Sequence, residues 1–155
     1  MLEIDYADPN HPEIVALLKQ SHALMQLFYS ADENHYLSTE ELCRPDVRFF
    51  GAKLHEIYVG CAALAIRDGY GEMKSLFTSP DHRRQGIAKE LIDALEKETR
   101  KHKFDILRLE TGALLGGALS LYKKLGFNTC GPFGNYREDP ASLFMFKYLN
   151  KSHDA

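Results

Sequence analysis

The chain has 155 residues, of which 45% are hydrophobic and 26% charged, and its formal net charge is −3. This length and composition predict one globular domain over residues 1–150, with residues 151–155 as a frayed tail. The mild negative charge argues against nucleic acid or an anionic membrane as partner.

Three cysteines, none in a C-x-x-C spacing, argue against a disulfide framework and favour a reducing, cytoplasmic location. The seven histidines do not cluster at ligand spacing, so no metal is expected. We find neither a signal-peptide pattern at the N-terminus nor an apolar run long enough to span a bilayer, and therefore expect a soluble protein.

Strands and helices are expected to alternate along the whole chain. The order begins with a strand at 2–6, a helix from Pro12 to about Tyr29, and a short helix that the Ser38–Glu41 capping box introduces. Strands follow at 47–54, 57–67 and 72–78, and a helical period starts at Gly86. The remaining elements are a strand at 106–110, a helix at 118–125 that Gly126 ends, and strands at 128–131 and 143–148. This order predicts an α/β (α+β mixed) fold with a central, mostly antiparallel sheet of about seven strands and about four helices.

The most informative segment runs from Glu72 to Lys89, where a strand leads through a polar turn into a basic, glycine-containing helix start. Free N–H groups at such a start favour an anion, and Arg83, Arg84 and Lys89 add positive charge. The segment matches neither the G-x-x-x-x-G-K-[ST] loop nor the G-x-G-x-x-G fingerprint. A pyrophosphate-bearing ligand is therefore indicated.

Two motifs then carry a resemblance to a known family. The segment Arg83-Arg84-Gln85-Gly86-Ile87-Ala88 resembles the R/Q-x-x-G-x-G/A signature of the GCN5-related N-acetyltransferase (GNAT) superfamily. The segment Ala118–Phe127 is similar to that family's A-x-x-L-Y-x-x-x-G-F helix. Segments 71–75, 109–112 and 138–142 also resemble the bacterial YsnE-type acetyltransferase branch.

The resemblance implies an N-acetyltransferase that uses acetyl-CoA (coenzyme A). Backbone groups of the strand before the turn would hold the pantetheine arm and polarise the thioester, and the turn would bind the pyrophosphate. The implied cofactor-binding residues are Leu76, Phe77, Thr78, Arg83, Arg84, Gln85, Gly86, Ile87, Ala88, Lys89 and Gly117. Leu115 occupies the place where many family members carry an asparagine, so that contact with the cofactor arm is absent or replaced by backbone at Gly116 or Gly117.

Two catalytic roles follow from the same resemblance. Tyr122 matches the family tyrosine near the CoA sulfur, and a phenol is protonated at neutral pH, so it can donate to the thiolate. Glu72 matches the glutamate used as general base, although its pKa would have to be raised by burial, or water would have to relay the proton. The alternatives are that Tyr122 is a core aromatic and that Glu72 forms a simple ion pair with Lys74.

The acceptor is expected to be a primary amine of a small molecule, attacking directly in a ternary complex. The proposed acceptor residues are His35, Tyr36, Lys74, Tyr136, Glu138 and Asp139. Acidic Glu138 and Asp139 with basic Arg137 and His35 would suit a zwitterion such as an amino acid. A protein lysine or N-terminus as acceptor, and a non-catalytic CoA-binding sensor, are the alternatives. The family often forms homodimers, so a homodimer is possible.

Overall fold

The computed structural model describes residues 1–30 and 36–149, and its centre is one seven-stranded sheet with the order β1-β2-β3-β4-β5-β7-β6. The strands are β1 (Leu2–Tyr6), β2 (Val47–Leu54), β3 (Ile57–Ile66), β4 (Gly71–Thr78), β5 (Ile106–Gly112), β6 (Asn128–Cys130) and β7 (Ser142–Tyr148). Every pairing is antiparallel except that of β4 with β5. The expected mixed, mostly antiparallel sheet is therefore confirmed.

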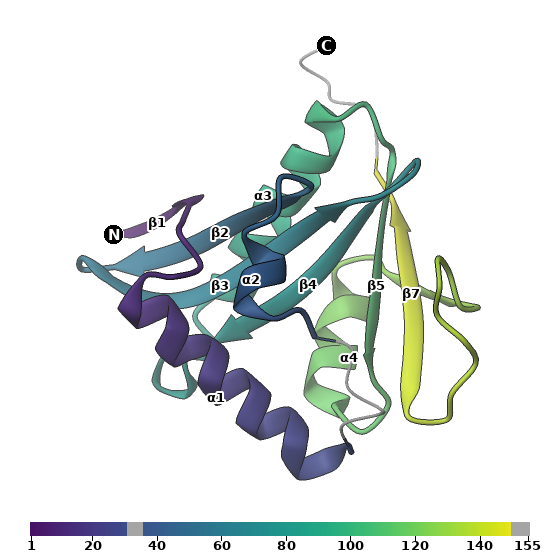
Figure 1. Ribbon diagram of the computed structural model, residues 1–155, viewed down its shortest axis with the longest axis horizontal. Coiled ribbons are helices and arrows are strands. Elements are labelled where there is room, and N and C mark those ends of the chain that lie inside the picture. The colour runs from purple at the N-terminus through teal and green to yellow at the C-terminus, as the bar shows by residue number, and fades with distance from the viewer. Residues whose placement is uncertain (31–35, 150–155) are drawn as a thin grey trace.

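Helices cover both faces of this sheet. They are α1 (Pro12–Phe28), α2 (Thr39–Leu42), α3 (Ile87–Lys101) and α4 (Gly116–Lys124), with a short 3-10 turn, η2 (Pro80–His82). Figure 1 shows α1 and α2 in front of the sheet and α3 behind it. No helix among residues 1–30 and 36–149 has the length and apolar character needed to cross a membrane.

Two apolar clusters correspond to these two layers. Ile14, Leu17 and Leu42 pack with Phe49 and Phe77 on the α1–α2 face. On the α3–α4 face the buried residues include Met73, Leu91, Ile92, Leu95, Leu107, Leu109, Tyr122 and Phe127. Because successive strand residues point to opposite faces of the sheet, the side chains of Met73 and Leu109 point toward α3 and α4, whereas those of Lys74 and Glu110 belong to the opposite face.

Local sequence signals explain most element boundaries. The Ser38 capping box is complete, because its hydroxyl accepts from Glu41 N while the Glu41 carboxylate accepts from Ser38 N. His55 and Glu56, which join β2 to β3, both have positive φ, as a tight hairpin turn requires. Gly126 follows α4 with φ 98°, the left-handed conformation expected after a helix C-terminus.

Two boundaries differ from the prediction by two residues, and several others by one: β5 ends at Gly112 where 110 was expected, and the start of α4 also differs. The last helix was expected to begin at Ala118, but α4 begins at Gly116. The amide of Leu119 donates to the carbonyl of Leu115, so the first turn of α4 includes Gly116 and Gly117. Glycine has a low helix propensity, so the sequence does not predict a helical turn at these two residues. The expected tail, 151–155, lies outside the described residues.

Candidate active site

The site begins where the parallel pair β4–β5 separates. Their ladder covers only Gly71–Met73 against Leu107–Leu109. Beyond Met73, β4 carries a bulge, in which Ser75 and Leu76 lie opposite one residue of β3. Ser75 has φ 57°, which is unusual for a residue with a side chain and marks a strained turn of the strand. Figure 1 shows β4 and β5 diverging from this point toward α4.

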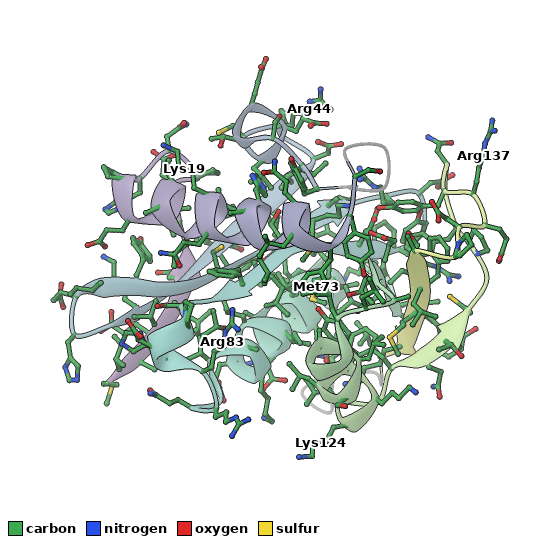
Figure 2. All side chains as sticks on the ribbon, turned by 90° about the horizontal axis from the view of Figure 1, so that it is seen from below. Lys19, Arg44, Met73, Arg83, Lys124 and Arg137 are labelled. Carbon is green, nitrogen blue, oxygen red and sulfur yellow. The ribbon has the colours of Figure 1, made fainter. Side chains whose placement is uncertain are left out.

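A cavity of about 690 Å³ occupies the space that the diverging strands leave. Its walls are residues 73–78 of β4, residues 109–112 of β5, the turn that precedes α3, and the first turns of α4. The end of α1 closes one side with Ser21, His22, Leu24, Met25 and Tyr29. Figure 2 shows Met73 near the middle of the molecule, between α1 and α4.

The basic turn forms one end of this cavity. Arg84 and Gly86 have φ 63° and 80°, and Gly86 is the N-cap of α3. A Cβ built on Gly86 meets nothing within 4 Å, so its surroundings are open to a ligand. Arg83 donates from Nε to Thr78 O (3.3 Å) and lies over the Phe77 ring, which fixes it at the strand end. The arrangement offers backbone donors and positive charge to an anion.

Most of the predicted cofactor-binding residues line this cavity. Leu76, Phe77, Thr78, Arg83, Arg84, Gly86, Ile87, Ala88, Lys89 and Gly117 all do so. Gln85 is exposed and is not part of the lining. Lys89 pairs with Asp93 at 3.2 Å on the exposed side of α3. Leu115, at the family asparagine position, and the neighbouring Gly116 also line the cavity.

Tyr122 lines the same cavity from α4. Tyr122 is only 7% exposed, and its ring packs edge-to-face on the ring of Phe127. Burial, with a smaller contribution from the Glu110 carboxylate, raises the pKa of the Tyr122 phenol. The phenol is therefore protonated at neutral pH and has a proton to donate.

Glu72 lies behind the cavity wall and not in it. Its side chain is 3% exposed, and both carboxylate oxygens have partners. Oε1 accepts from Arg67 Nε at 3.0 Å, and Oε2 accepts from the Tyr136 hydroxyl at 2.6 Å. Lys74 Nζ lies 3.6 Å from Oε2 and donates to the Tyr136 hydroxyl at 2.7 Å. The simple Glu72–Lys74 pair of the alternative prediction is thus part of a four-residue network.

The predicted acceptor residues divide into three groups. Lys74 and Tyr36 line the cavity, whereas Tyr136 is not part of the lining and accepts a hydrogen bond from Lys74. Glu138 and Asp139 do not line the cavity, and Asp139 instead accepts from Ala141 N. Arg137 is exposed, and Figure 2 shows it at the outer edge of the molecule, away from Met73. His35 lies outside the described residues.

Several lining residues were not predicted from the sequence. The carboxylate in the cavity wall is Glu110, whose Oε2 accepts from Ser142 Oγ at 2.8 Å. His22 stacks on Tyr36, and burial lowers the pKa of its imidazole. His22 Nε2, Ser75 Oγ and His82 Nδ1 are buried atoms of lining residues that have no hydrogen-bond partner among residues 1–30 and 36–149. These positions carry no motif, and only the helical period of α1 and the alternation of β5 could have indicated which of them share a face.

Comparisons with known proteins agree with this geometry. The model of the acetyltransferase (GNAT) family matches residues 15–127. The chain is 39% identical to an "IAA acetyltransferase" of Azospirillum brasilense, over 91% of this chain and 94% of that protein. It is 35% identical to the uncharacterized N-acetyltransferase YsnE of Bacillus subtilis (strain 168), over 96% of this chain and the whole of that protein.

A solved structure from Klebsiella pneumoniae, named as an acyl-CoA N-acyltransferase, has a TM-score of 0.81 and 31% identity, and covers 97% of this chain and 99% of its own. Structures of the same fold contain CoA or acetyl-CoA. A divided parallel strand pair beside a basic, glycine-containing helix start therefore defines a coenzyme A-dependent acyltransferase. The chain belongs to the GNAT family and is an N-acetyltransferase that uses acetyl-CoA.

Proposed function

We propose that the protein transfers the acetyl group of acetyl-CoA to a primary amine of a small molecule, by direct attack in a ternary complex. The observation that carries this proposal is the continuity of the cavity. One cavity joins the basic turn, suited to pyrophosphate, to a far end that contains Lys74, Glu110, Tyr29 and Tyr36. A cofactor arm along β4 would bring its thioester to an enclosed space for the acceptor.

Residues 76–78 would hold the pantetheine arm and polarise the thioester carbonyl through backbone N–H groups. Beyond Met73, β4 has no ladder with β5, so that edge of the strand faces the cavity. The turn at 83–89 would bind the pyrophosphate. Gly117, across the cavity, would contact the part of the pantetheine arm next to the pyrophosphate. Gln85 would contribute its backbone amide, since its side chain does not line the cavity.

The reaction forms a bond between the amine nitrogen and the acetyl carbon and breaks the bond between that carbon and sulfur. The amine must lose a proton, and the departing thiolate gains one. Tyr122 is the proposed donor to the thiolate, because its phenol is protonated and lines the cavity.

The proton acceptor has two candidates. Glu72 remains the predicted base, and it would act through the Tyr136 hydroxyl and Lys74, because it does not line the cavity itself. Glu110 is the carboxylate that lines the cavity directly. The variants Glu72→Gln and Glu110→Gln separate the two, since only loss of the base should remove the low-pH limb of the rate profile. If both profiles equal that of the wild type, neither carboxylate is the base.

An amine library with release of free CoA thiol as readout tests the function itself. Acetylation of small amines, with no acetylation of peptides, supports the proposal. A preference for peptide lysines or N-termini would favour the protein-acceptor alternative. Binding of acetyl-CoA without any acetyl transfer would favour the sensor alternative. A cytoplasmic location and a homodimer remain predictions, which localisation of a tagged chain and sedimentation would test.

A further inference from the structure

Lys74 and Glu110 form an opposite-charge pair at the point where the strands divide. The last ladder pair of β4 and β5 is Met73 with Leu109, so the next residues along the two parallel strands are Lys74 and Glu110. Both belong to the face opposite to Met73 and Leu109, and both line the cavity. Their charges interact, because the Glu110 carboxylate acts to raise the pKa of Lys74. One cation and one anion therefore lie at the same level of the cavity, on its two walls.

Lys74 is held in place from behind. Its side chain is 6% exposed, and it donates to Tyr136, which in turn donates to Glu72. Glu72 also pairs with Arg67, so two cations share one buried carboxylate. Burial is the largest cause of a lowered Lys74 pKa, which means that its ammonium form lacks part of the solvation it has in water. Because Lys74 also lines the cavity, an anionic group of a ligand there would lie next to this ammonium.

Other charged and titratable groups among the described residues also lie around Lys74. Glu110 is engaged by Ser142, and Glu41 of α2, whose carboxylate interacts electrostatically with Lys74, is already bound to the Ser38 amide. His22 lines the same cavity, and its lowered pKa keeps the imidazole uncharged at neutral pH. Among the described residues that line this end of the cavity, Lys74 supplies the cation and Glu110 the carboxylate.

The wall beyond this pair is apolar and aromatic. Leu24 and Met25 of α1 and Tyr29, which follows this helix, line it, and the stacked rings of His22 and Tyr36 complete it with centroids 3.9 Å apart. Such a wall favours an apolar or planar group over a charged one.

We propose that the acceptor is an α-amino acid with an apolar or aromatic side chain, whose carboxylate binds Lys74 and whose amino group lies beside Glu110. This inference rests on the proposed function. The two groups of an α-amino acid are joined through one carbon, which suits a cation and an anion at one level of two neighbouring strands. The zwitterion expected from the sequence is thus assigned to different residues, because Arg137, Glu138 and Asp139 do not line the cavity.

The test compares acceptors that share a side chain and differ at the carboxylate. Phenylalanine, phenylalaninamide and phenethylamine are acetylated in parallel at saturating acetyl-CoA, with thiol release as readout. Leucine, leucinamide and isoamylamine form a second set. We expect kcat/KM for each amino acid to exceed that of its amide and its decarboxylated amine by about tenfold to a hundredfold, as for a charged hydrogen bond.

The variant Lys74→Met should remove this preference by raising KM for the amino acids, so that its kcat/KM for phenylalanine falls to that for phenylalaninamide in the same variant, whatever the loss of a relay through Lys74 does to the rates with all the amines. A purely structural lysine would lower the rates of all the amines together. Lys19→Met is the matched control, because Lys19 is an exposed residue of α1 on the side away from the sheet (Figure 2) and does not line the cavity. Lys74→Arg keeps the charge and should keep the preference, which preserves the test if Lys74→Met fails to fold.

Equal rates for the acid and its amide, or an unchanged preference in Lys74→Met, would overturn the inference. So would a wild-type protein that binds acetyl-CoA in calorimetry but acetylates no amino acid of the panel, a result that leaves its use of acetyl-CoA intact. A protein that does not bind acetyl-CoA would contradict the proposed function itself.

Discussion

The phenolic oxygen of Tyr29 occupies the place where any other residue at position 112 would carry its Cβ. A Cβ built on Gly112 would lie 2.1 Å from Tyr29 Oη and 2.4 Å from the ring carbon that bears it. The same hydroxyl accepts from Leu114 N at 2.8 Å. Tyr29 therefore joins the end of α1 to the loop that leads into α4, and so connects the acceptor side of the cavity to its cofactor side.

Gly112→Ala should displace Tyr29 and break its bond to Leu114. We expect a loss of about 2–4 kcal/mol in the free energy of unfolding, from overpacking and one lost hydrogen bond. Denaturant titration measures it. Gly116→Ala is the matched control, because a Cβ there meets nothing within 4 Å. Equal stability of the two variants would show that Tyr29 moves aside without cost.

Tyr122→Phe tests the proposed proton donor. The change removes only the hydroxyl, so the packing on Phe127 remains. We expect kcat to fall by about a hundredfold, within the usual range for general acid catalysis, and the Kd of acetyl-CoA to stay within about twofold. Steady-state kinetics and calorimetry measure the two quantities. Tyr148→Phe, at a largely exposed position of β7, is the control. An unchanged kcat would make Tyr122 a purely structural residue.

The basic turn should bind the cofactor through charge. Arg84→Ala is expected to weaken acetyl-CoA binding by about tenfold at low salt, and less at high salt, because salt screens exposed charges. Lys97→Ala, which removes an exposed cation of α3 outside the cavity lining, should leave Kd unchanged. Calorimetric titration at two salt concentrations makes the comparison. Equal effects of the two variants would indicate a general charge effect and no specific contact.

Glu72 should matter for stability whatever its role in catalysis. Glu72→Gln leaves Lys74 and Arg67 without their shared carboxylate, so we expect a loss of about 3 kcal/mol in the free energy of unfolding. In the double variant Glu72→Gln/Lys74→Met the buried cation is absent, and the loss should be smaller than the sum of the two single losses. Urea titration of the three variants measures this coupling. Strict additivity would contradict the network.

His22 should make the fold sensitive to mild acid. Burial lowers its pKa in the folded state, so the unfolded chain, with an ordinary pKa near 6.5, binds the proton more readily. The stability that neutral His22 contributes is complete above about pH 6.5 and is lost as the pH falls through the folded-state pKa. His22→Gln should therefore lose less stability than the wild type between pH 7.5 and pH 5.5. Parallel slopes of Tm against pH in the two proteins would contradict this.

Local signals in the sequence were enough to predict the class of fold and the residues that line the proposed cofactor end of the cavity. The turn at 83–88 is local, since its glycine, its cations and the following helical period are contiguous, and ten of the eleven predicted cofactor residues line the cavity. Tyr122 also lies in a local motif, which extends only from Ala118 to Phe127, and it also lines the cavity. Strand and helix boundaries were predicted closely because capping, hairpin and glycine signals act over a few residues.

The proposed acceptor end could be assembled only from the three-dimensional structure, because its residues come from segments far apart in the chain. Strand alternation places Glu72 and Lys74 on one face of β4. The Glu72 carboxylate is bound by the hydroxyl of Tyr136, a residue 64 positions later in the chain, and does not line the cavity, whereas Lys74 does. The register of β4 against β5 brings Glu110 level with Lys74, and the bulge at Ser75 opens the space between the strands. Neither non-local pairing nor a bulge leaves a pattern in one sequence, so the sequence predicts Lys74 but also the loop residues Glu138 and Asp139, which do not line the cavity, and it gives no signal for Glu110, which does.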